Sequence, residues 1–165
     1  MFAIPTHRLV LLTGAMAIAL TACAFETPAP TSTVGGSQQE FSFGEPADPA
    51  SGDRVIEITG TDDFRFDPAQ LTVQVGETVT FRVVNAGTQV HDFTLGDEAT
   101  QIEHAEEMTE MTGMSMPDEP NAITVAGGET KEVTWRFTQA GTVLIGCHQP
   151  GHYENGMKGS VRVQA

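Results

Sequence analysis

The amino-acid sequence predicts an all-β fold, an antiparallel β-sandwich of about seven to eight strands with one inserted helix. Short segments rich in β-branched and aromatic residues fill most of its C-terminal two thirds, and several alternate apolar with polar side chains. Glycine-containing turns separate these segments. With 165 residues, the chain has room for one ordinary domain plus appendages. The predicted strands are residues 55–59, 71–75, 78–84, 91–95, 122–125, 131–137, 141–145 and 158–163.

Residues 1–22 have the features of an export signal. Arg8 precedes an apolar run that ends at Leu20, and this run is shorter than the roughly 20 residues that cross a bilayer. The segment Leu20–Cys23 resembles the lipobox of bacterial lipoproteins, which implies that Cys23 is lipidated and becomes the mature N-terminus. The alternative is an ordinary signal that is cleaved nearby and leaves no lipid anchor.

Residues 23–52 are predicted to form a flexible tether. Pro, Thr, Ser, Gly and Ala dominate this stretch, and such a composition cannot bury enough apolar surface to fold alone. Phe41 and Phe43 are exceptions, which either dock on the domain or lie exposed in the linker. The folded domain is therefore predicted to span residues 53–165.

One segment of the domain, at about residues 97–121, interrupts the strand pattern because it is acidic and rich in methionine. Thr100 and Glu103 predict a capping box at the start of a helix, and Gly113 predicts its end. On a helix that turns about 100° per residue, the glutamates of this segment share one face and its apolar side chains lie on the opposite face. The two sets are Glu103, Glu106, Glu107 and Glu110 against Ile102, Ala105 and Met108. We expect an amphipathic helix that lies over the sandwich.

The segment Gly146–Met157 contains the chemically distinctive side chains of the domain. It holds the Cys147 thiol, the His152 imidazole and the Met157 thioether at regular spacing. Such donors suit copper that cycles between Cu(I) and Cu(II), and a His₂Cys set with a weak axial Met describes an electron-transfer centre. The second histidine must come from elsewhere in the chain. If Cys23 is lipidated, Cys147 is the single thiol of the mature domain, so no internal disulfide can form.

These residues make the sequence similar to the cupredoxins, the copper proteins that include plastocyanin, azurin and auracyanin. The resemblance covers roughly residues 54–165 and implies a Greek-key sandwich with one type 1 copper. His91 matches the family's ligand on a middle strand, whereas Cys147, His152 and Met157 match the ligands on the loop between the last two strands. The loop is especially similar to that of exported bacterial cupredoxins associated with copper tolerance, which also carry an acidic helical insertion.

His148 directly follows Cys147, and in a strand-like backbone its side chain points away from the copper. We therefore expect it outside the ligand set. In multicopper oxidases a histidine beside the type 1 cysteine leads to further coppers. The histidines beyond the leader are too few for a trinuclear centre, being His91, His104, His148 and His152. The single thiol also excludes a two-cysteine dinuclear centre, so we expect no catalytic residues and no enzymatic turnover.

A second group of soft side chains lies in the acidic insertion, at His104, Met108, Met111, Met114 and Met116. The first three fall within a narrow arc of the predicted helix. Two interpretations stay open. Either the methionines pack the helix onto the sandwich and shield the copper loop, or they form a second, weak Cu(I) site with His104, because thioethers are soft Cu(I) ligands.

The net charge of −14 at pH 7 makes nucleic acid an unsuitable partner, because phosphate binding depends on clustered Lys and Arg. A basic protein or metal cations fit better. We expect a type 1 copper protein that exchanges single electrons with a redox protein such as a cytochrome or an oxidase. It would act outside the cytoplasmic membrane, in the periplasm or anchored by lipid to the outer face of the cell membrane.

An exported copper-tolerance protein, which binds or sequesters copper, is the alternative function. A metal-free adhesion domain is a third interpretation, and a copper-dependent visible absorption band would exclude it. No small-molecule substrate is expected in any of the three cases.

Overall fold

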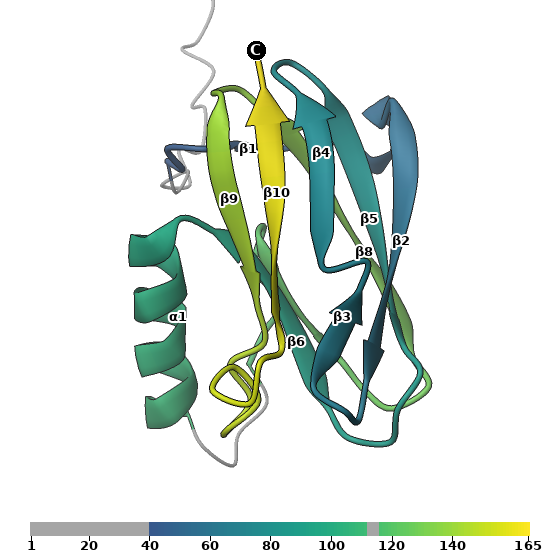
Figure 1. The fold of residues 1–165 in the computed structure, drawn as a ribbon, viewed down its shortest axis with the longest axis vertical. Helices are drawn as coiled ribbons and strands as arrows, with labels where there is room; N and C mark the ends of the chain where they lie inside the picture. The colour runs from purple at the N-terminus through teal and green to yellow at the C-terminus, as the bar shows by residue number, and fades with distance from the viewer. Residues whose placement is uncertain (1–39, 112–115) are drawn as a thin grey trace, which may run out of the picture. The chain divides into compact units, whose positions relative to one another are not determined.

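The computed structural model describes residues 40–111 and 116–165, which form two five-stranded sheets and one α-helix (Figure 1). The first sheet has the order β1-β8-β5-β2-β3, with bounds Gly44–Pro46, Thr130–Phe137, Thr78–Asn85, Arg54–Thr61 and Arg65–Asp67. The second has the order β4-β10-β9-β6-β7, with bounds Gln70–Gln74, Lys158–Gln164, Gly141–Gly146, His91–Gly96 and Ala122–Val125.

The β-sandwich prediction is confirmed, with two differences in detail. All of the predicted strands form, but β1 and β3 were not predicted because three residues are too few to show a period. The sheets are mixed rather than antiparallel, since β2 pairs with β5 and β4 pairs with β10 in parallel. Alternation at a period of two is common to both kinds of ladder, so the sequence pattern does not distinguish them.

Aromatic side chains fill the space between the sheets. Phe81, Phe93, Trp135 and Phe137 are completely buried. Phe93 from the second sheet lies 5.7 Å from Phe81 and 5.9 Å from Phe66 of the first sheet, measured between ring centroids. These contacts join the two sheets into one hydrophobic core.

The sandwich begins earlier in the chain than the composition predicts. Strand β1 pairs with β8, and Phe43 is only 5% exposed, stacked on Trp135 at a centroid distance of 5.1 Å. Burying one such aromatic side chain contributes about 2 kcal/mol. A short 3₁₀ helix at Pro49–Ser51 follows. The two phenylalanines therefore dock on the domain, because their apolar area outweighs the tether-like composition around them.

The predicted signal peptide (residues 1–22), the lipidation site Cys23 and the tether up to residue 39 lie outside the described residues. Within the described residues, no helix is both long enough and apolar enough to cross a membrane.

The inserted helix α1, Glu98–Glu110, lies beside β6 and β9 (Figure 1). It begins before the predicted capping box because the Asp97 carboxylate caps it, accepting from the Thr100 N–H at 3.0 Å. Its buried residues are Gln101, His104 and Met108, whereas Ile102 is 56% exposed. The predicted apolar face is therefore wrong at Ile102.

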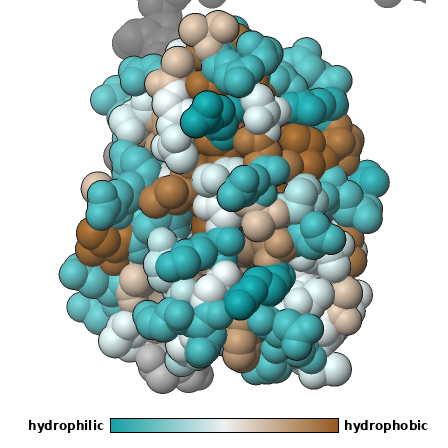
Figure 2. Space-filling model, viewed as in Figure 1, coloured by the Kyte–Doolittle hydropathy of each residue, from teal (hydrophilic) through white to brown (hydrophobic). Residues whose placement is uncertain are grey.

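Polar partners on the underlying sheet decide which face of α1 is buried. The Gln101 side-chain amide donates to the Thr94 carbonyl oxygen on β6 at 3.0 Å, a bond that no apolar side chain can make. The outward face carries Glu103, Glu106 and Glu110, which are exposed as predicted. In Figure 2 the edge formed by α1, at the left, is accordingly mainly hydrophilic with small hydrophobic patches.

Candidate metal centre

The β9/β10 ladder brings Cys147 and Met157 side by side. Gly146 at the end of β9 pairs with Lys158 at the start of β10, so the loop between them leaves and re-enters adjacent strands (Figure 1). The Cys147 N–H donates to the Met157 carbonyl oxygen at 3.1 Å, and the Met157 N–H donates to the His152 carbonyl oxygen at 3.0 Å. The loop is therefore closed by its own backbone hydrogen bonds, which limit its freedom.

His91 opens β6, which is paired with β9. The approach to His91 is held by Asp62, whose carboxylate accepts from the Thr88 N–H at 2.9 Å and the Gln89 N–H at 3.1 Å. Hydrogen bonds from these two N–H groups lower the pKa of Asp62, and the bond from Gln89 has the largest effect. A Cβ on Gly87 would clash with the same carboxylate, so a side chain at this position would displace Asp62. The β2–β3 turn thus fixes where β6 begins.

Three donor atoms converge at this end of the sandwich. His91 Nδ1 lies 3.2 Å from His152 Nδ1, which lies 3.3 Å from Cys147 Sγ. His91 is 2% exposed, Cys147 0% and His152 7%. Nitrogen ligands that share one metal ion at about 2.0 Å each lie about 3.2 Å apart at tetrahedral angles. The donor set therefore fits a single first-row metal ion.

Met157 is completely buried on the same loop and approaches the chain at Gly60 in β2. A Cβ at Gly60 would lie 3.1 Å from Met157 Cε and 3.4 Å from His91 Cδ2. The missing side chain of Gly60 thus leaves room for the thioether beside the imidazole. A buried thioether next to a His₂Cys cluster is the arrangement of a type 1 copper site.

The protonation states of these side chains suit metal binding. Burial, followed by the charge of Asp92, raises the pKa of the Cys147 thiol far above its ordinary value. Burial also lowers the pKa of His91, assisted by His152, and it lowers the pKa of His152. Without metal the thiol is protonated and both imidazoles are neutral. Metal binding must therefore release the Cys147 proton, whereas the imidazoles are ready to bind.

Asp92, for which the sequence predicted no role, holds the backbone of the cysteine loop. It is 2% exposed, and its carboxylate accepts from the N–H groups of His148 and Gln149 at 2.9 Å. Its own N–H donates to Cys147 Sγ at 3.4 Å. Burial raises the pKa of Asp92, but the neighbouring His104 imidazole and the hydrogen bond from the His148 N–H bring it below the ordinary value. The signal available in the sequence was a carboxylate directly after the expected copper ligand His91.

His148 lies outside the donor cluster. Its Nε2 is 2.7 Å from Gln101 Oε1 on α1, and its ring stacks on Tyr153 at a centroid distance of 4.7 Å. Burial lowers its pKa. The inserted helix therefore contacts the cysteine loop through His148, one residue beyond the thiol.

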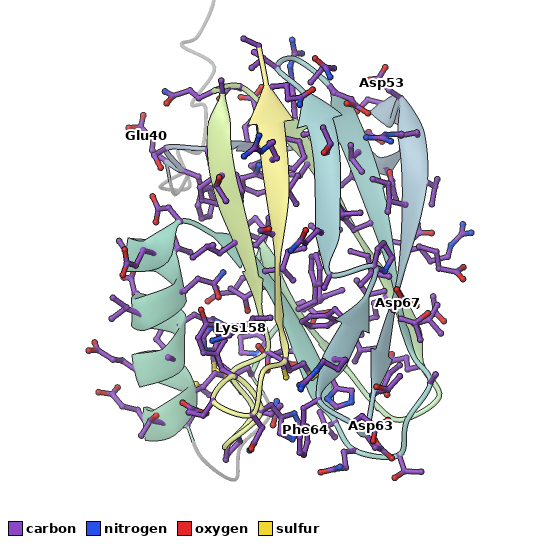
Figure 3. All side chains as sticks on the ribbon, in the orientation of Figure 1. Glu40, Asp53, Asp63, Phe64, Asp67 and Lys158 are labelled. Atoms are coloured by element: carbon purple, nitrogen blue, oxygen red, sulfur yellow. The ribbon has the colours of Figure 1, made fainter. Side chains whose placement is uncertain are left out.

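Phe64 was also missed by the sequence analysis, and it covers His152. Its ring centroid lies 4.5 Å from that of the imidazole, and Figure 3 places Phe64 at the loop end of the sandwich. Its backbone has a φ of 57°, which is unusual for a bulky residue. Arg65 links this turn to the cysteine loop, since its Nη1 donates a hydrogen bond to the Asn155 carbonyl oxygen at 2.7 Å.

Four of the five residues of the predicted second copper group lie within the described residues. His104 and Met108 are buried on the inner face of α1, Met111 is the C-terminal cap of the helix, and Met116 is partly buried. Met114 lies outside the described residues. A Cu(I) site formed by these five residues stays a prediction.

A β-sandwich with a buried His₂Cys cluster and an adjacent Met at one end is a cupredoxin with a type 1 copper site. Comparison with known proteins supports the same class of protein. The family described as "Copper binding proteins, plastocyanin/azurin family" matches residues 54–164. The chain therefore belongs to the plastocyanin/azurin family, and its cofactor is copper.

Relatives of two kinds are similar to this chain. The "Copper-resistant cuproprotein CopI" of Rubrivivax gelatinosus is 43% identical over 74% of this chain and 73% of that protein. The protein of the same name from Pseudomonas aeruginosa is 36% identical over 74% and 83%. Among solved structures, dithionite-reduced auracyanin from Roseiflexus castenholzii has a TM-score of 0.60 at 26% identity, covering 69% of this chain and 99% of auracyanin.

Proposed function

We propose that the protein carries single electrons through one type 1 copper bound by His91, Cys147, His152 and Met157. The observation that carries this proposal is the convergence of two Nδ1 atoms and one thiol sulfur in a buried cluster. Copper supplies one-electron cycling between Cu(I) and Cu(II) at such a site. His91 and His152 provide neutral nitrogens, Cys147 provides a thiolate, and Met157 provides a weak axial sulfur.

The surrounding chain supports this role by keeping the donors in place. Cys147 and Met157 flank paired strands, and His91 begins a strand of the same sheet. The Asp92 N–H, directed at Cys147 Sγ, stabilises negative charge on the sulfur. Donors held in this way need little rearrangement when the charge of the site changes by one, which favours rapid electron exchange.

The proposed setting is outside the cytoplasmic membrane, either in the periplasm or with Cys23 lipid-anchored to the outer face of the cell membrane. The apolar leader and the lipobox-like Leu20–Cys23 support this location. The proposed partner is a redox protein such as a cytochrome or an oxidase. Because this chain is strongly acidic, a partner with a basic surface would be attracted to it. The protein would have no enzymatic turnover of its own.

Copper titration tests the proposed site. Adding Cu(II) to metal-free protein is expected to produce an intense visible charge-transfer band that stops growing once about one copper per chain is bound to the buried thiolate, whatever further copper binds to other donors. Absorption spectroscopy with metal analysis measures both quantities. Saturated copper binding without such a band would contradict a type 1 site.

Copper tolerance is the second candidate function, and the two cuproproteins named for copper resistance favour it. Deleting the gene distinguishes the candidates. A tolerance protein predicts slower growth only at elevated copper, whereas an electron carrier predicts a respiratory or photosynthetic defect without added copper. Complementation with the wild-type gene should restore growth, and complementation with Cys147→Ser should not. Restoration by Cys147→Ser would show that the copper site is not needed for the phenotype.

A further inference from the structure

A second cluster of side chains that can bind a metal lies at the inner edge of α1 and contains none of the four proposed copper ligands. His104 Nδ1 is 3.8 Å from Glu107 Oε2 and 4.0 Å from Glu119 Oε2. Glu107 lies one turn along the helix, whereas Glu119 lies on the segment that leads into β7. The potential ligand atoms of the three residues lie within 4.8 Å of one another.

The imidazole of this cluster is buried without hydrogen bonds. His104 is 5% exposed, and neither of its ring nitrogens has a hydrogen-bond partner. Buried polar atoms are nearly always paired, so an unpaired imidazole requires an explanation. A cavity of about 10 Å³, lined by His104, Glu107, Glu119 and Asn121 among others, adjoins it. Asn121 Oδ1 is likewise buried and unpaired.

The charges around this cluster favour a cation. Burial opposes charge on His104, but Asp92, Glu119 and Glu107 raise its pKa, so a metal ion bound here would replace the imidazole proton. Two carboxylates close to each other repel, and burial followed by the charge of Glu119 raises the pKa of Glu107. A cation in the cavity would neutralise both carboxylates and engage the imidazole nitrogen. Ligands that share one ion at about 2.1 Å each lie at most about 4.2 Å apart, and the two distances from His104 Nδ1 to the carboxylates satisfy this limit.

The other side of the imidazole has the arrangement found around many metal-bound histidines. His104 Nε2 lies 3.6 Å from Asp92 Oδ2, so a carboxylate faces the nitrogen that points away from the cavity. Such a carboxylate orients the ring and strengthens it as a ligand. Asp92 therefore contacts both clusters, because it also accepts hydrogen bonds from the His148 and Gln149 N–H groups of the cysteine loop.

We propose that His104, Glu107 and Glu119 form a second metal site, which binds a divalent first-row cation such as Zn²⁺ or Cu²⁺. One imidazole with two carboxylates suits these ions, whereas Cu(I) prefers sulfur. The site thus differs from a methionine-based Cu(I) site in its donors, although both include His104. It is also independent of electron transfer at the type 1 centre.

Zn²⁺ binding to the copper-loaded protein tests the proposal. Zn²⁺ has no visible absorption and binds nitrogen and oxygen ligands less tightly than Cu²⁺, so it should leave the type 1 centre filled. Equilibrium dialysis with metal analysis should find about one Zn²⁺ per chain beyond the copper. The Glu107→Gln and Glu119→Gln variants should each weaken Zn²⁺ binding by about tenfold or more, with the copper band unchanged as a check on folding.

Glu106→Gln is the matched control. It removes the same charge from the neighbouring position, but Glu106 is exposed and lines the outward side of α1 with Ile102. Its Zn²⁺ affinity should stay within about twofold of wild type, as expected for a surface charge. Absence of the additional Zn²⁺ in wild type, or an equal loss in Glu106→Gln and Glu107→Gln, would overturn the proposal. Because Zn²⁺ is read by metal content and the type 1 centre by its visible band, either site can fail alone.

Discussion

Replacing Cys147 with serine is expected to abolish the visible charge-transfer band of the copper-loaded protein. The band arises from a copper–thiolate bond, and a hydroxyl group does not ionise readily enough to replace the thiolate. The Cys147 side chain is 0% exposed and lies 3.3 Å from His152 Nδ1, and it is the single cysteine of residues 40–111 and 116–165. Absorption spectroscopy during Cu(II) titration measures the effect.

His148→Gln is the control for that experiment. His148 is adjacent in sequence, but its Nε2 contacts Gln101 on α1 rather than the donor cluster. The variant should therefore keep the band while losing the stacking on Tyr153. Circular dichroism would confirm that both proteins are folded. Retention of the band by Cys147→Ser, or its loss in His148→Gln, would refute the assignment of the thiolate.

Neutralising Asp92 is expected to raise the reduction potential of the copper centre. Its carboxylate, 3.4 Å from Cys147 Sγ, is buried and has a pKa below the ordinary value, so it is charged at neutral pH. Negative charge beside the metal favours Cu(II) over Cu(I). A unit charge at about 5 Å contributes about 3 kcal/mol at an effective dielectric constant near 20, so Asp92→Asn should raise the potential by on the order of 100 mV.

Asparagine is the appropriate replacement because its side-chain oxygen can still accept the His148 and Gln149 N–H groups. Asp62→Asn is the matched control, since Asp62 lies 3.9 Å from His91 Nε2 but has a side chain that is 38% exposed. Water screens that charge, so its removal should shift the potential much less. Protein-film voltammetry measures both variants. A fall in potential for Asp92→Asn, or shifts of equal size in the two variants, would contradict the argument.

Much of the candidate site was predictable because three of its donors are local. Cys147, His152 and Met157 fall within one loop, where their chemistry is visible in the sequence. His91 is more than fifty residues away, and only the resemblance to cupredoxins pointed to it. Asp92 and Phe64 were missed because their roles depend on neighbours brought by other strands, namely the cysteine loop and His152.

The inserted helix shows the same limit. Its existence followed from composition and spacing, yet its buried face did not, because Gln101 is held inward by a carbonyl group on β6. Hydrophobic periodicity ranks side chains by polarity alone. It therefore placed Ile102 inward, where the structure has it exposed.

The sequence by itself determined the class of fold, most of the strand segments and the three predicted donors of the cysteine loop, because these depend on alternation and on the chemistry of single residues. Only the tertiary structure decided the parallel pairing of β2 with β5 and β4 with β10, the docking of Phe43, and the contacts that Asp92 makes with His104 and the cysteine loop. These features join segments far apart in the chain. They depend on which side chains come into contact after folding, and a local sequence pattern carries no information on such long-range contacts.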